Sequence, residues 1–236
     1  MTELLTGWNE LIFAFVLFVA SHLIPARPAI RERLMRHIGK AAYLAGYSTL
    51  SIFIFGWLIA AAGRAPYVAL WQFAPWQMWI PNVIMPFVCL LLACGIAAPN
   101  PLSIASRDDA AYDPGHPGIV GLTRHPVLWA AALWAFAHAV PNGDLAHVIL
   151  FGLFGTFSLF GLVVIDARKR RALGADEWRR LSRHTSFVPL AALLAGRWLP
   201  SLGEINLFRL VAAVGLYIGL LVLHEPVVGV SPFSPL

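Results

Sequence analysis

Histidines are the residues of this chain whose chemistry and placement most strongly suggest a function. Four of them, His22, His125, His138 and His224, lie in or at the ends of long apolar segments. An ionisable side chain at membrane depth is costly, so its presence indicates a functional role. A neutral imidazole is the commonest metal ligand and a standard axial ligand of haem iron. Two histidines on different helices can hold one haem between them.

The sequence around His138 suits a flat cofactor. If this segment is helical, Ala131, Trp134 and Ala135 share the face of His138. Alanines leave room for a planar macrocycle, and an indole ring can stack on it. The alternative is structural: the alanines allow close helix packing, and the histidine is an interfacial residue bonded to a carbonyl.

The run Arg124-His125-Pro126 opens an apolar segment, where proline suits the first turn of a helix. Arg124 and His125 can bind an anionic ligand or cofactor. Equally, Arg124 can fix the topology while His125 lies at the membrane interface. Cys89 and Cys94 lie in one apolar run without a CxxC motif, so we expect buried hydrophobic roles. The sequence contains no P-loop, GxSxG or HExxH motif.

The elements that position these residues are predicted to be membrane-spanning helices. Of 236 residues, 59% are hydrophobic and 12% are charged, and the mean hydropathy is +0.72; soluble domains carry about 25% charged residues. Continuous apolar runs favour helices over a barrel. We predict an all-α polytopic bundle with about six spans: Leu4–Ile24, Ala41–Ala62, Trp79–Ala98, Arg124–Val140, Leu145–Ile165 and Leu207–His224. The apolar stretch Phe187–Leu199 is too short to span, so we expect an interfacial helix or packed loop.

The basic residues predict an orientation. They follow the first, third and fifth expected spans, whereas the other connections hold only Arg64. Because cytoplasmic loops are enriched in Lys and Arg, both termini are expected outside. The net charge of +5 is then explained by topology and lipid headgroups rather than nucleic acid. The first apolar run lacks the basic start of a secretory signal, so we expect a retained helix.

Several stretches together resemble the NnrU family of bacterial membrane proteins. The resembling pieces are Ser21-His22-Leu23-Ile24-Pro25-Ala26-Arg27-Pro28, Gly121-Leu122-Thr123-Arg124-His125-Pro126, Leu133-Trp134-Ala135-Phe136-Ala137-His138, Asn142-Gly143-Asp144, Ile165-Asp166-Ala167-Arg168-Lys169 and Thr185-Ser186-Phe187-Val188-Pro189. The resemblance runs from about Phe13 to His224. It implies that residues 1–236 form one transmembrane domain in a bacterial inner membrane.

The NnrU family is similar to zeta-carotene isomerase, a membrane enzyme with haem b. The resemblance implies haem b as the cofactor and His22 and His138 as its iron ligands. A cysteine proposed as an exchangeable ligand is replaced here by Ala135. In the predicted topology, however, His22 lies near the inner membrane face and His138 near the outer. Depth alone would pair His22 with His125, and His138 with His224.

A weaker resemblance is to isoprenylcysteine and phospholipid methyltransferases, which carry RHPxYxG at a helix start. Here the run continues Val127-Leu128-Trp129-Ala130, and only Asp166 stands where an acidic pair is expected. Three functions therefore remain open. The first is a haem-b protein of the NnrU type, which, if it is an enzyme, acts on a lipophilic polyene or small redox species. The others are a methyltransferase relative using Arg124 and His125, and a non-catalytic membrane sensor. The sequence leaves the substrate and oligomeric state undefined.

Overall fold

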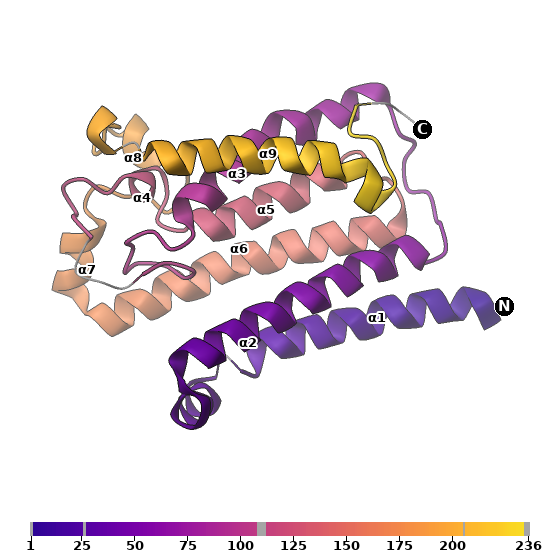
Figure 1. Ribbon diagram of the computed structural model, residues 1–236, viewed down its shortest axis with the longest axis horizontal. Helices are drawn as coiled ribbons and strands as arrows, with labels where there is room; N and C mark the ends of the chain where they lie inside the picture. Colours follow the sequence, from indigo (N-terminus) through magenta and orange to yellow (C-terminus); the bar gives the residue numbers. More distant parts are fainter. Residues whose placement is uncertain (1, 26, 108–111, 205, 234–236) are drawn as a thin grey trace. The chain divides into compact units, whose positions relative to one another are not determined.

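The chain folds into helices, as the composition predicted (Figure 1). The structure is a computed structural model that describes residues 2–25, 27–107, 112–204 and 206–233, and this described part contains no strand. The longer helices are α1 (Thr2–Leu23), α2 (Pro28–Arg64), α3 (Trp79–Gly95), α5 (Pro126–Ala139), α6 (Leu145–Leu173) and α9 (Leu207–Val228). The shorter ones are η1 (Pro75–Met78), α4 (Ile119–Leu122), α7 (Ala175–Ser182), α8 (Ala191–Leu194) and η2 (Leu202–Glu204).

Helices of membrane-spanning length account for most of the predicted spans. Four in the described residues are long and apolar enough to cross a bilayer: Pro28–Arg64, Pro75–Gly95, Leu145–Leu173 and Leu207–Val228. The first and fourth predicted spans correspond to shorter apolar helices, Gly7–Leu23 and Pro126–Ala139. The all-α membrane bundle is therefore confirmed.

Several helix ends differ from the prediction. Helix α2 is interrupted at Gly39, whose φ is +81°, so its second part agrees with the predicted span from about Ala41, whereas the helix before Gly39, beginning at Pro28, lies outside the predicted spans. Helix α6 continues to Leu173, beyond the predicted Ile165. The stretch Phe187–Leu199 contains only the single turn of α8. Residues 26 and 108–111, which fall in a resembling motif and in a polar loop, lie outside the described residues.

The chain divides into two compact units, and each is described by itself. The first comprises Met1–Gln72 and Gly143–Leu150. In it α1 packs along α2 (Figure 1), and the Glu10 carboxylate accepts hydrogen bonds from Trp57 Nε1 at 2.8 Å and Arg64 Nη2 at 2.6 Å. The backbone of Gly143 is held by Leu70 N–H at 2.7 Å.

The second unit comprises Phe73–Asn142 and Phe151–Leu236, and it is built around α3. Helices α5 and α9 both pack on α3 (Figure 1). Gly95 permits one close approach, because a Cβ there would lie 2.7 Å from Pro126. Contacts of Gly155 with Phe136 and of Gly161 with Leu128 show that α5 and α6 are antiparallel.

This topology gives the second unit two chemically different ends. The carboxyl ends of α3 and α6 meet the amino ends of α5 and α9, and this end is called the basic end. Its basic side chains include Arg124, Arg168, Arg170, Arg171 and Arg209. His138 and His224 lie toward the opposite end, near the carboxyl ends of α5 and α9.

Arg209 joins two helices at the basic end. Its Nη1 donates to the carbonyls of Ala93, Cys94 and Ile96 at 2.8, 3.0 and 2.9 Å, and its Nη2 donates to Ala97 at 3.1 Å. The last carbonyls of a helix have no partner within it, and a cation there also opposes the negative end of the helix dipole. Arg209 therefore caps α3 while anchoring the start of α9.

Replacing Arg209 by glutamine should destabilise the protein by about 1.5–3 kcal/mol, because charge-assisted hydrogen bonds to several carbonyls are lost. The midpoint of thermal unfolding in detergent measures this loss. Arg168→Gln is the control, since this exposed side chain makes no ion pair with the described residues. Equal midpoints for the two variants would contradict the capping role.

Candidate functional site

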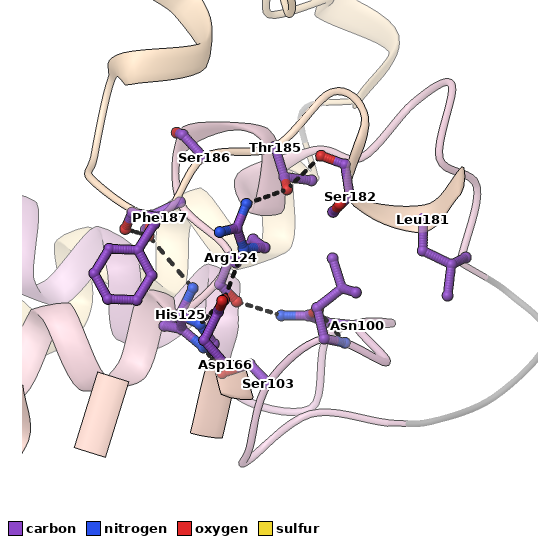
Figure 2. Close-up of polar contacts among 12 residues, drawn as sticks. Asn100, Ser103, Arg124, His125, Asp166, Leu181, Ser182, Thr185, Ser186 and Phe187 are labelled. Atoms are coloured by element: carbon purple, nitrogen blue, oxygen red, sulfur yellow. Dashed lines mark hydrogen bonds and ion pairs between the residues drawn. The ribbon is translucent and has the colours of Figure 1, made fainter. Parts of the chain in front are cut away.

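A cluster of polar side chains lies at the basic end of the second unit, and Asp166 is its centre (Figure 2). Oδ1 of Asp166 lies 3.0 Å from Nε of Arg124 and 3.0 Å from Nε2 of His125. Asp166 comes from α6, whereas Arg124 and His125 directly precede α5. A buried charge is tolerated when it is paired and hydrogen-bonded. The Asp166 carboxylate provides this pairing for both Arg124 and His125.

The ring of His125 is held through both nitrogens. Its side chain is 0% exposed, and Nδ1 lies 2.8 Å from Oγ of the buried Ser103. A carboxylate only accepts, so Nε2–H donates to Asp166. In a neutral imidazole Nδ1 then accepts the hydroxyl hydrogen of Ser103. This hydrogen bonding fixes the ring and its tautomer, and neither nitrogen is left for a metal.

Arg124 is surrounded on several sides. Its Nη1 donates to Thr185 Oγ1 at 3.4 Å, and its guanidinium carbon lies 5.4 Å from the ring of Trp178 and 6.0 Å from that of Phe187. Its side chain is 14% exposed. Such a cation is stabilised by carboxylate, hydroxyl and aromatic faces together.

The backbone of the same segment is fixed by connections from two loops. Asn100 Nδ2 donates to the carbonyl of Arg124 at 2.9 Å, and the amide of Arg124 donates to the carbonyl of Ser186 at 2.8 Å. Nearby, the Tyr112 hydroxyl donates to the carbonyl of Leu181 at 3.0 Å. Burial raises the pKa of the Tyr112 phenol, which keeps this donor protonated.

The predicted pair Arg124 and His125 is thus brought together, but with internal partners. Both side chains are hydrogen-bonded to Asp166, and their binding of an anionic ligand or cofactor remains a prediction. The helix starts at Pro126, as expected from its proline, with His125 as the residue before it. We infer that the hydrogen bonds of this cluster hold α5, α6 and the loops together.

His138 lies at the far end of α5 from this cluster. Its Nδ1 lies 2.8 Å from the carbonyl of Trp134, one helical turn earlier. A carbonyl only accepts, so Nδ1 carries the hydrogen and Nε2 carries the lone pair. The ring lies 5.3 Å from that of Trp134 and 5.7 Å from that of Phe151, and Ala135 is fully buried.

His22 shows the same hydrogen bond in the first unit. Its Nδ1 donates to the carbonyl of Phe18 at 2.8 Å, near the carboxyl end of α1. The ring centroid lies 4.3 Å from that of Phe18 and 5.9 Å from that of Tyr47. His22 and His138 belong to different units, and their pairing on one iron remains a prediction.

Sequence reasoning found Arg124 and His125 but missed most of their partners. Three of these partners come from loops, whose conformation cannot be predicted from a periodic pattern in the sequence: Ser103, Asn100 and Thr185. The sequence indicates Asp166 only as the single acid at the place where the methyltransferases carry an acidic pair. The sequence does contain one signal for this pairing. Asp166 is a lone acid at the end of an apolar run, on the same predicted membrane side as Arg124 and His125.

Asp166→Asn should lower the stability of the protein by about 1–3 kcal/mol, because the amide keeps an acceptor but loses the charge that pairs with Arg124. Thermal unfolding in detergent is the measurement. Asp176→Asn is the matched control, because that side chain is 94% exposed and should change stability by about 0.5 kcal/mol or less. An unfolding midpoint for Asp166→Asn as high as that of the control would remove Asp166 from its central role.

Comparison with known proteins agrees with the resemblance seen in the sequence. A family model described as NnrU protein matches residues 10–232. The 15-cis-zeta-carotene isomerases of the chloroplast are similar: the Arabidopsis thaliana protein is 31% identical over 99 residues, and the Zea mays protein is 30% identical over 98. Each match covers 42% of this chain and 26% of the plant protein. No solved structure matches. Because the family model covers nearly the whole sequence, this chain belongs to the NnrU family.

Proposed function

We propose that this chain is an integral membrane protein that binds haem b, with His138 as an iron ligand and His22 as the predicted second ligand. Its location is the bacterial cytoplasmic membrane, with the basic end of the second unit in the cytoplasm and both termini in the periplasm. The observation that carries the proposal is the hydrogen bond from His138 Nδ1 to the carbonyl of Trp134.

That hydrogen bond meets the chemical requirement for an axial ligand. Metal-bound histidines usually donate their second ring N–H to a carbonyl or carboxylate, which fixes the ring and increases its basicity. His138 carries the lone pair on Nε2 because its Nδ1–H is donated to the Trp134 carbonyl, and His22 Nδ1 makes the equivalent hydrogen bond to the Phe18 carbonyl. His125 differs, since both of its nitrogens are bonded to side chains.

The available donors favour haem over a metal held by protein alone. Among the described residues, no three His, Cys, Asp or Glu side chains come together. Haem supplies four nitrogen ligands itself and needs only one or two from the protein. When bound, it would supply one-electron chemistry or a coordination position for a substrate.

The residues around His138 have separate roles in this proposal. The Trp134 carbonyl holds the imidazole orientation, and the Trp134 and Phe151 rings exclude water from its faces. Ala135, one helical turn before His138, is fully buried. The similarity to carotene isomerases suggests a lipophilic polyene as the substrate class, with a small redox species as the alternative. A methyltransferase role has less support, because Arg124 and His125 are already paired.

Purified protein from haem-supplemented cells should show a Soret band, and His138→Ala should lose it. Addition of free imidazole should restore absorbance to His138→Ala, because the missing ligand is replaced without repairing any packing. His22→Ala tests the second ligand by the same spectrum, oxidised and reduced. His116→Ala is the control, because that exposed side chain contacts Asp113 outside the spans. A band in His138→Ala identical to that of the unmodified chain would refute the assignment.

A further inference from the structure

A shallow hollow opens on the basic end of the second unit, at the end of α6. It has a volume of about 480 Å³ and is lined by Val163, Asp166, Ala167, Arg170, Arg171 and Phe187. One part of the lining is apolar and the other carries two guanidinium groups. This combination suits an amphiphile with an anionic head better than a free inorganic ion.

The two arginines supply positive charge that the protein itself does not neutralise. The side chain of Arg170 makes no hydrogen bond or ion pair with the described residues, and the Nε of Arg171 donates only to the carbonyl of Ala167, at 3.3 Å. The acid in the lining, Asp166, is already balanced by Arg124 at 3.0 Å. The hollow therefore presents a net positive surface.

The length of α6 places the hollow at headgroup depth. Its 29 residues span about 43 Å at 1.5 Å per residue, whereas the hydrocarbon core is about 30 Å thick. If the apolar start of the helix fills the core, Val163 lies near its boundary. Arg170 then lies about 10 Å further along the axis, where lipid phosphates lie.

We propose that this hollow binds one anionic phospholipid, with the phosphate at Arg170 and Arg171 and the start of an acyl chain against Val163 and Phe187. Basic pockets beside membrane-spanning helices bind such headgroups on the cytoplasmic side. The site is separate from His138 and does not depend on bound haem. A lipid there would join the end of α6 to the segment that follows α7, next to the Asp166 cluster.

Native mass spectrometry of the full chain in detergent, titrated with phosphatidylglycerol, tests this site. The variant Arg170→Gln/Arg171→Gln should bind roughly twenty-five-fold more weakly, because each basic side chain near an anionic headgroup contributes about fivefold. The control Arg33→Gln/Arg168→Gln removes the same charge elsewhere and should bind as the unmodified chain does. Equal binding by both double variants would overturn the proposal.

Three further binding experiments distinguish a specific lipid site from nonspecific electrostatic attraction between the protein and anionic lipid. Ala167→Trp fills the hollow without changing charge and should abolish specific binding; retained binding there would contradict a built site. Phosphatidylcholine should bind much more weakly than phosphatidylglycerol. Equal binding of the two lipids would show that only the apolar part of the hollow binds, which would contradict recognition of an anionic headgroup. Inorganic phosphate should not displace phosphatidylglycerol, and full competition would reassign the hollow to a free anion.

Discussion

The structure of the second unit depends on one carboxylate. Asp166 accepts from both Arg124 and His125, each at 3.0 Å, and so joins α6 to the start of α5. Without it, a guanidinium and a buried imidazole would share a site from which water is largely excluded. Such a site is stable only when every donor has an acceptor, which explains why Ser103 and Thr185 are drawn in from the loops.

The two histidines at the ends of α5 differ in their hydrogen bonds. At its amino end, His125 uses both nitrogens to hold the fold together. At its carboxyl end, His138 uses only Nδ1 within the helix and keeps Nε2 as a lone-pair nitrogen. The two histidines thus differ in their hydrogen bonds, and we propose that they also differ in role. We propose that an anionic lipid also binds at the amino end of α5, beside the exposed Arg170 and Arg171 of α6.

The sequence predicted the helices, which follow from the apolar runs. It did not predict the residues that the loops bring to the Asp166 cluster. The long helices and the helix start at Pro126 were predicted, because apolar length and proline position are local signals. The helix before Gly39 was not predicted, because Pro28–Ile38 is too charged to look like a span. Helix α6 continues to Leu173, beyond the predicted span end at Ile165, because its charged last turns extend past the apolar run. The partners of His125 were not predictable, because Ser103 and Asp166 are brought to it only by tertiary folding.

We propose that His138 at the carboxyl end of α5 holds haem, whereas the Asp166 cluster at the amino end of α5 holds the fold. Haem b content per polypeptide, measured as the pyridine haemochrome on purified protein, tests it most directly. Asp166→Asn, studied well below its lowered unfolding temperature, should keep the haem of the unmodified chain, whereas His138→Ala should contain almost none. Loss of haem from folded Asp166→Asn, with retention in His138→Ala, would contradict it.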